Sequence, residues 1–298
     1  MQPLTVLSLF DGISCGKLAL DRAGVPVKAY YASEIKKNAI KISKKHYPDI
    51  IQIGDVKNLH YKDGVLFSDA GEIRTGEIDL MIGGSPCQNF SIANLYSRDG
   101  LGGEQSKLFY EFLRLLRQVQ PKYFLVENVR MSTKHRRELD AYLGVEGIDI
   151  NSELVSFQHR PRIYWTNIDD VTIPEDRHIH FQDYKEKNPD IAREYMLNRT
   201  PYAKRLWNDG KGGRGFHAAK NITHATKTKT VTTRQDALPN SGLIECEDFC
   251  RTLTRGEIEQ AQTLPVGYTD GLSYRQMQDV VGNAWTVDVI AHIFSFIK

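Results

Sequence analysis

Short apolar runs alternate with amphipathic segments over the first 170 residues. The runs have the length and composition of buried strands, and the segments between them carry apolar residues at helical spacing. The predicted strands cover 4–10, 29–34, 50–56, 78–84 and 122–128. The predicted helices cover 16–24, 36–48 and 106–120. This alternation predicts an α/β fold with a mostly parallel sheet and helices on both faces.

Periodicity continues through two further apolar runs and then fades. Two further strands are predicted at "SELVSF" (152–157) and "RIYWTNI" (162–168). The segment 171–254 is rich in Gly, Lys, Asn, Thr and His, which indicates a smaller, irregular domain. Thr254 and Glu257 have capping-box spacing, so a helix is expected to begin there. The closing segment, 273–297, has helical spacing interrupted at Gly282. We therefore expect one large domain, made of 1–170 and 255–298, and a second domain at 171–254.

The charge of the chain is unevenly distributed. The net charge is +2, yet the segment 199–234 holds nine Lys or Arg residues against one acid, Asp209. The rest of the chain is acidic overall, with 30 basic and 36 acidic residues. A basic segment on an acidic body predicts that a polyanion binds there, and a solvated loop is the alternative.

Composition narrows the class of protein further. The apolar runs are far shorter than the roughly 20 residues that a membrane span needs, and no basic patch precedes the first one, so we expect a soluble intracellular protein. The four cysteines, Cys15, Cys87, Cys246 and Cys250, do not have the spacing of a zinc finger or ribbon. We expect no metal, and we expect Cys246 and Cys250 to be buried thiols.

Polar residues follow the first three predicted strands, where a parallel sheet places its ligand. The first strand runs into "FDGISCG" (10–16), which lacks the glycine pattern of a pyrophosphate site. Glu34 ends the second strand and suits two ribose hydroxyls, while Asp55 ends the third and suits an adenine amino group. Together they predict a site for an adenosine-bearing cofactor without phosphates. Taken singly, each residue is more often a turn glycine or a capping acid.

A cysteine and a glutamate mark the next two strand ends. Cys87 follows the fourth predicted strand in "GGSPCQNF", and Glu127 ends the fifth. Neighbouring strand ends can face one pocket, so the pair is a candidate for nucleophilic catalysis. A structural cysteine is the alternative. The glycine-rich stretch at 94–107 is expected to close over a bound base, or else to be a passive surface loop.

The ordered motifs "FDGISCG", "GGSPCQ", "ENV", "QHRPR", "RTLTRGE" and "GNAWTV" resemble those of the C5-cytosine DNA methyltransferases. The likeness runs nearly end to end, except at about 171–220, and is strongest to the animal de novo enzymes and their bacterial and phage relatives. It implies a Rossmann-like methyltransferase domain and a target-recognition domain at 171–254. It also implies S-adenosylmethionine as methyl donor, double-stranded DNA as partner, and the cytoplasm of a prokaryotic or phage-infected cell.

The resemblance assigns a role to each matching residue. The implied catalytic residues are Cys87 as nucleophile, Pro86 before it, Glu127 as acid toward ring nitrogen 3, Arg160 and Arg162 against the base and its phosphate, and Asn128 holding the Cys87 loop. The implied cofactor residues are Phe10, Asp11, Gly12, Ile13, Ser14, Gly16, Glu34, Ile35, Asp55, Val56, Asn283, Ala284 and Trp285. The implied DNA contacts are Lys211, Arg214, Thr232, Thr233 and Arg234.

Other functions remain open at this point. A subgroup of the same family methylates transfer RNA with the same motifs, and catalytically dead partners exist that lack the motif cysteine. A dehydrogenase is disfavoured because the glycine fingerprint is missing. The protein is expected to be a monomer or a homodimer. It is also expected to flip its target base out of the duplex before it acts on it.

Overall fold

The computed structural model describes residues 1–84, 107–197, 221–235 and 242–298. The chain divides into two compact units. The first comprises Met1–Ile150, Pro161–Pro174 and Val287–Lys298, and the second comprises Asn151–Arg160 and Glu175–Thr286. The domain bounds expected from sequence stay a prediction.

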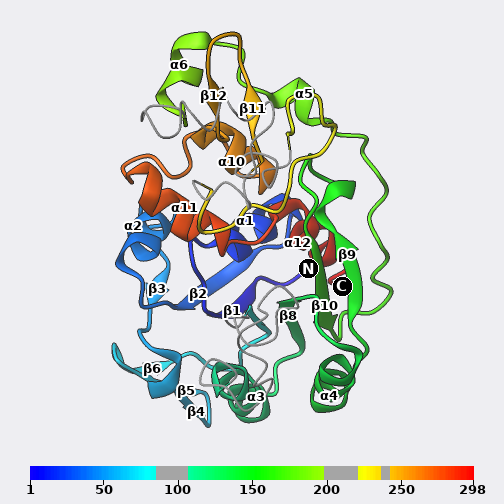
Figure 1. The fold of residues 1–298 in the computed structure, drawn as a ribbon. Coiled ribbons are helices and arrows are strands. Elements are labelled where there is room, and N and C mark those ends of the chain that lie inside the picture. Colours follow the sequence, from blue (N-terminus) through cyan, green and yellow to red (C-terminus); the bar gives the residue numbers. More distant parts are fainter. Residues whose placement is uncertain (85–106, 198–220, 236–241) are drawn as a thin grey trace. The chain divides into compact units, whose positions relative to one another are not determined.

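A seven-stranded sheet, β3-β2-β1-β7-β8-β10-β9, forms the frame of the first unit (Figure 1). Its strands are β1 (Leu4–Leu9), β2 (Val27–Ser33), β3 (Ile51–Gln52), β7 (Leu80–Gly83), β8 (Tyr123–Val129), β9 (Ile148–Asn151) and β10 (Pro161–Thr166). The pairs from β3 across to β8 are parallel, and β10 runs antiparallel to β8. The α/β fold with a mostly parallel sheet is confirmed, and the carboxyl ends of five strands share one edge.

Helices follow the strands as the periodicity predicts. They are α1 (Cys15–Arg22), α2 (Lys37–His46), α3 (Lys107–Val119), α4 (Thr133–Leu143) and α12 (Val287–Phe294). Of these, α4 was not predicted; its cap is Ser132, whose Oγ accepts a hydrogen bond from His135 N, and it ends at Gly144 with φ 71°. That positive φ favours glycine, which carries no Cβ.

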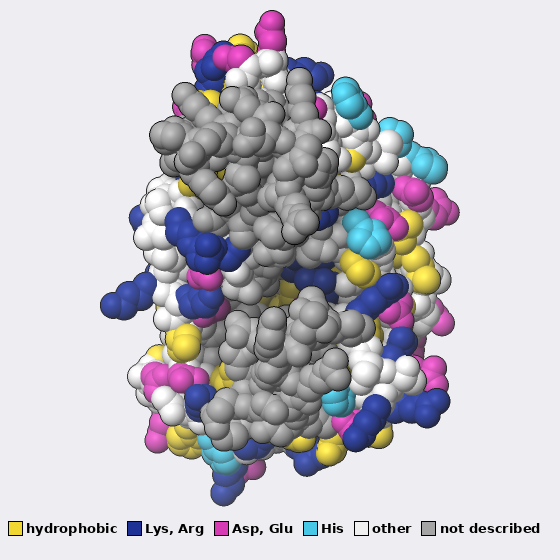
Figure 2. Space-filling view, in the orientation of Figure 1, with side chains coloured by type: hydrophobic (Ala, Val, Ile, Leu, Met, Phe, Trp, Pro, Cys, Tyr) yellow, Lys and Arg dark blue, Asp and Glu magenta, His cyan; other side chains and the backbone are white. Residues whose placement is uncertain are grey.

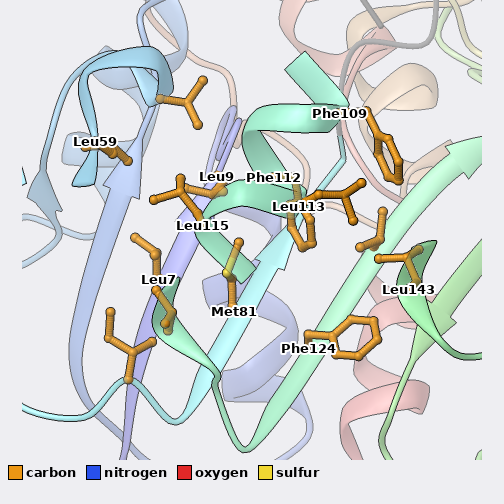
Figure 3. Packing of buried hydrophobic residues seen from close by; sticks show 14 of the residues in the cluster. Leu7, Leu9, Leu59, Met81, Phe109, Phe112, Leu113, Leu115, Phe124 and Leu143 are labelled. Carbon is orange, nitrogen blue, oxygen red and sulfur yellow. The ribbon is translucent and has the colours of Figure 1, made fainter. Parts of the chain in front are cut away.

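The core of the first unit lies between the sheet and helices α3 and α4. One buried cluster holds Leu7 and Leu9 of β1, Met81 of β7, Phe112 of α3 and Leu143 of α4 (Figure 3). Residues two apart on a strand point to the same face, so alternate positions of β1 feed this cluster. The burial of large apolar side chains fixes the register of the strands and thereby the position of their ends.

Three local predictions change. The strand expected at 50–56 is shortened to β3 (Ile51–Gln52), so Asp55 lies in the loop after it and not at its end. "SELVSF" is not a strand: Ser152–Leu154 forms the 3-10 turn η3, with Asn151 Oδ1 accepting from Glu153 N. The segment between β3 and β7 holds an unpredicted three-stranded antiparallel sheet of β4 (His60–Lys62), β5 (Val65–Ser68) and β6 (Gly71–Arg74). Strands of three or four residues are too short to carry a clear periodic signal.

The second unit is irregular, as expected for 171–254. Its elements are α5 (Phe181–Tyr184), α6 (Pro189–Glu194), β11 (Ile244–Glu245), β12 (Cys250–Arg251), α10 (Arg255–Ala261) and α11 (Tyr274–Gly282). The capping box at Thr254 is confirmed, and α11 ends at Gly282 where the periodicity breaks. Arg251 and Glu257 form a buried ion pair at 2.7 Å beside that box.

The surface in view mixes acidic and basic side chains (Figure 2). Over the described ranges no helix is long and apolar enough to cross a membrane. Within the same ranges, no group of three His, Cys, Asp or Glu side chains could hold a metal ion.

Candidate functional site

Glu34 joins the carboxyl ends of β1 and β2. Its Oε2 accepts a hydrogen bond from Gly12 N at 2.8 Å, and its Oε1 accepts from Ile35 N and Lys36 N, each at 2.8 Å. Gly12 has φ 62°, a conformation that suits glycine. The two predicted cofactor segments are therefore brought together, and a half-buried carboxylate lies between them.

Asp11 is the buried acid of the same loop. Its Oδ1 accepts from Ser8 Oγ and from the Tyr30 hydroxyl, both at 2.7 Å, and its Oδ2 accepts from Ser14 Oγ at 2.6 Å. Burial raises the pKa of Asp11 to about 6, although the three hydroxyl hydrogen bonds oppose that rise; the charge of Glu34 adds to it. The buried Asp11 side chain thus holds the loop after β1 in place. The sequence did not predict Ser8 and Tyr30 as its hydrogen-bond partners.

The loop after β3 lies beside the end of β2. Ser33 Oγ donates to Gly54 O at 2.8 Å, and the Asp55 side chain accepts from Lys57 N at 3.0 Å. Asp55 thereby caps the 3-10 turn η1 (Val56–Asn58), in which Val56 is buried. Three adjacent strand ends therefore form one continuous candidate cofactor surface within the first unit.

The remaining predicted cofactor residues fall into two groups. Phe10 and Ser14 have positive φ values of 56° and 61°, so the loop after β1 is tightly wound, and Ile13 is buried. Gly16 is buried in α1, and Ile35 is exposed. Asn283, Ala284 and Trp285 belong to the second unit, in the connection after α11.

Glu127 and Arg162 form an ion pair within the first unit. Arg162 Nε lies 2.9 Å from Glu127 Oε1, and both side chains are 13% exposed. The antiparallel register pairs Tyr164 with Glu127 and Arg162 with Val129, so the two charged residues are diagonal neighbours on one face. A carboxyl group beside a guanidinium offers complementary groups to the polar edge of a nucleobase.

Asn128, next to Glu127, is 1% exposed. Its Oδ1 accepts from Val129 N at 2.8 Å. Its buried Nδ2 has no hydrogen-bond partner in the part of the chain that the structure describes. Because a buried unpaired donor is costly, this amide is suited to hold a neighbouring loop.

Arg160, in the second unit, is 4% exposed and donates to backbone carbonyls. Its Nη1 lies 2.8 Å from Val231 O, and its Nη2 lies 3.2 Å from Gly282 O and 3.0 Å from Ala284 O. Gln262 Nε2 also donates to Ala284 O at 3.0 Å. Arg160 thus shapes the connection that carries Trp285, and its expected contact with a base stays a prediction.

The DNA-contact candidates are only partly described. Lys211, Arg214, Pro86, Cys87 and the 94–106 part of the loop expected to close over the base lie outside the described residues. Thr232 and Thr233 are half-buried, with Thr233 O accepting from Arg275 Nη1 at 2.9 Å. Arg234 is exposed. These three residues are consecutive in a segment that bends at Thr233, where Arg234 N donates to Thr232 Oγ1 at 3.3 Å.

A cavity of about 790 Å³ in the second unit borders this segment. Its lining includes His159, His224, Lys227, Lys229 and Thr230. Lys227 Nζ donates to the carbonyls of residues 153, 156 and 179 at 2.6–3.0 Å, and desolvation lowers its pKa. A basic, threonine-rich hollow is chemically suited to an anionic backbone.

Comparisons with known proteins identify relatives of this chain. A family model described as C-5 cytosine-specific DNA methylase matches residues 4–298. The orphan methyltransferase M.Rho11sI of Bacillus phage rho11s is 31% identical over 192 residues, covering 60% of this chain and 36% of that protein. DNA (cytosine-5)-methyltransferase DRM1A of Oryza sativa subsp. japonica is 38% identical over 122 residues, covering 39% and 25%. The aligned regions thus span about a third or less of these two relatives.

Solved structures share the fold. The Entamoeba histolytica methyltransferase EhMeth has a TM-score of 0.75 at 16% identity, covering 99% of this chain and 98% of that chain. The S. pombe Dnmt2 methyltransferase has a TM-score of 0.72 at 20% identity, with the same coverage. The Rossmann-like architecture expected from the motifs is confirmed.

Proposed function

Because the chain belongs to the C-5 cytosine-specific DNA methylase family, we propose that it transfers the methyl group of S-adenosylmethionine to carbon 5 of a cytosine in duplex DNA. The observation that carries the proposal is the Glu127–Arg162 pair at the end of β8. That strand lies beside β7, and the chain leaves β7 toward Cys87. An acid, a guanidinium and a thiol are the groups that this reaction requires.

The strand-end loops fit the methyl donor better than a dinucleotide. Asp11 and Glu34 place two carboxyl groups at the loop after β1, where a pyrophosphate would be repelled. The adenosine of S-adenosylmethionine carries no phosphate, and Glu34 suits its ribose hydroxyls. Asp55 and Val56 are assigned to the adenine, and Asn283, Ala284 and Trp285 to the methionine part. The bound donor supplies an electrophilic methyl group.

Cys87 is assigned as the nucleophile. Its thiolate adds to carbon 6 of the cytosine and makes carbon 5 electron-rich enough to take the methyl group. Glu127 protonates ring nitrogen 3, which neutralises the charge that the addition creates. After methyl transfer a base removes the carbon 5 proton, the thiolate leaves, and ring nitrogen 3 returns its proton to Glu127, so the enzyme is regenerated.

The positions around these two groups are assigned supporting roles. Arg162 holds Glu127 at Oε1 and contacts the base, with Arg160. Asn128 Nδ2, which has no hydrogen-bond partner among the described residues, is assigned to the loop that carries Pro86 and Cys87, which would satisfy a buried donor. Reaching the base requires flipping it out of the duplex, with the stretch at 94–107 closing over it.

Duplex DNA is the proposed partner, and residues 171–254 are proposed to select its sequence. The nine basic residues of 199–234 support this, together with the basic cavity beside Thr232. Lys211 and Arg214, with Thr232, Thr233 and Arg234, are the proposed contacts. Binding should weaken with salt, with a slope of about 0.9 per phosphate contact.

Trapping with 5-fluorocytosine tests the proposal. Fluorine at carbon 5 cannot leave as a cation, so the adduct persists once the methyl group is transferred. Duplex DNA with 5-fluorocytosine at the target, together with S-adenosylmethionine, should give a protein–DNA complex that survives a denaturing gel. Cys87→Ala should abolish the complex while Cys246→Ala, as matched control, keeps it. Glu127→Gln should slow its formation.

Substrate choice is tested with the same protein. Tritiated donor is offered with duplex DNA and, separately, with transfer RNA, and bisulfite sequencing of DNA from an expressing, methylation-free host gives the site. Methylation of transfer RNA alone would replace DNA as substrate. A Cys87→Ala variant that still methylates DNA would overturn the mechanism.

A further inference from the structure

The turn between β5 and β6 carries an acid that contacts the loop after β3. Asp69 Oδ2 accepts a hydrogen bond from Asp55 N at 2.8 Å, and Asp69 Oδ1 accepts from Asn58 Nδ2 at 2.7 Å. One carboxylate thus holds both ends of the four-residue stretch 55–58. That stretch contains the residues assigned to the adenine, Asp55 and Val56.

Gly54 leaves room for this carboxylate. Its φ is +85°, and a Cβ placed on it would lie 2.6 Å from the Cβ of Asp69 and closer still to its Oδ2. Any side chain at 54 would therefore displace Asp69 as well as strain the backbone. The loop after β3 is shaped around the acid of the neighbouring turn.

The sheet that presents Asp69 is itself anchored. Leu66 of β5 is fully buried, and the Tyr61 hydroxyl donates to Gly76 O at 2.8 Å. Helix α3 reaches the same region: Gln118 Oε1 accepts from Tyr61 N at 3.1 Å, and Arg114 Nη2 donates to Leu59 O at 2.8 Å. The turn that holds Asp69 is therefore tied to the core of the first unit.

We propose that Asp69 is a positioning residue for the methyl donor, holding the backbone of Asp55 and Val56 in its binding geometry before the donor arrives. This rests on the proposed function, because it takes that loop as the adenine site. A loop ordered in advance does not lose conformational freedom on binding, so affinity rises. The adenine end lies away from the reacting methyl group. Loss of the two hydrogen bonds that Asp69 accepts should therefore raise KM for the donor and leave kcat at saturation unchanged.

The variant Asp69→Ala tests this. It removes both acceptor oxygens, so Asp55 N and Asn58 Nδ2 lose their shared partner. Kd for S-adenosylhomocysteine, by calorimetry, and KM for S-adenosylmethionine should both rise about tenfold. The kcat should stay within about twofold of the unmodified protein.

A double variant in which the side chains at positions 58 and 69 are exchanged distinguishes the loss of these hydrogen bonds from a general loss of the fold. In the double variant Asp69→Asn/Asn58→Asp, the amide introduced at position 69 accepts from Asp55 N through its oxygen and donates to the carboxylate introduced at position 58, so donor affinity should match that of the unmodified protein. Glu72→Gln, an exposed acid on β6 of the same sheet, is the matched control and should leave KM unchanged.

Each outcome decides a different point. If Asp69→Ala binds the donor as tightly as the unmodified protein, or if the double variant binds it as weakly as Asp69→Ala, the proposed role of Asp69 is wrong and the proposed function stands. If the unmodified protein binds no S-adenosylhomocysteine, the proposed function fails. Thermal melts of all four proteins identify a variant that has lost its fold.

Discussion

Glu34 in the first unit and Arg160 in the second unit shape their loops with opposite charges. The Glu34 carboxylate accepts hydrogen bonds from the backbone amides of Gly12, Ile35 and Lys36. The Arg160 guanidinium donates to backbone carbonyls, as the Lys227 ammonium of the same unit also does. Exposure separates the two cases further: Glu34 is half-buried and accessible to a ligand, whereas Arg160 is 4% exposed. Removing Arg160 should therefore cost folding stability, and removing Glu34 should cost ligand affinity.

The largest effect is expected for Arg160→Met. The methionine fills much of the volume but leaves the carbonyls of Val231 and Gly282 without the Arg160 donor, whereas Ala284 O keeps its hydrogen bond from Gln262 Nε2. We expect the free energy of unfolding to fall by about 4 kcal/mol, since each unsatisfied buried group costs about 1–3 kcal/mol. Urea denaturation of the ligand-free protein measures it. The exposed residue Lys187 provides the control, Lys187→Met, and an equal effect of the two changes would contradict a structural role for Arg160.

Asp11 differs from Glu34 by being buried in the fold, which predicts a pH-dependent stability. The folded-state pKa is raised from 3.8 to about 6, so the folded protein binds more protons than the unfolded chain between these values. Stability therefore falls as pH rises through that window, by about 3 kcal/mol in total. Asp11→Asn has no titrating group at this position. Its free energy of unfolding, measured relative to that of the unmodified protein, should therefore rise by about 2 kcal/mol from about pH 4.5 to about pH 7.5.

Urea denaturation at several pH values tests the Asp11 prediction. Glu72→Gln is the control, because Glu72 is exposed and should give a difference from the unmodified protein that is flat with pH. A flat difference for Asp11→Asn as well would contradict the raised pKa.

Glu34→Ala tests the accessible carboxylate in the comparison between Glu34 and Arg160. The change removes the acceptor that joins the loops after β1 and β2 together with the group assigned to the ribose. Affinity for S-adenosylhomocysteine should fall by about 2 kcal/mol, the value of a charged hydrogen bond, while the melting temperature changes little. Calorimetry measures the affinity, and Asp49→Ala at an exposed position is the control. Unchanged affinity would remove Glu34 from the site.

The fold of the first unit could be predicted from the sequence because the patterns that indicate it are local. Buried parallel strands appear as apolar runs, and the residues just after them lie at one sheet edge, which is how Asp11, Glu34 and Asp55 were found. Glu127 followed from the same rule, and the structure adds its partner Arg162 through the antiparallel register of β10.

The contacts that sequence did not predict depend on partners without a signature. Arg160 meets the carbonyls of residues 71 to 124 positions away, and a carbonyl is present in every residue. Asp69 in "FSDAG" looks like an ordinary turn acid, and its partner Asp55 N is again backbone. A long-range bond from a side chain to the backbone can be assigned only when the fold brings the two together.

The smallest effect is expected for a surface pair of the second unit. Arg193 Nη2 contacts both carboxylate oxygens of Asp248 at 3.0 Å, but the two side chains are 49% and 59% exposed. Water and salt screen such a pair, so Asp248→Asn should lower the free energy of unfolding by about 0.5 kcal/mol or less. The loss should shrink further in about 0.5 M salt. Urea denaturation at low and high salt measures both. Arg193 and Arg160 are the same residue type in the same unit, so a large effect here would mean that charge, not burial against carbonyls, determines what an arginine contributes to this fold.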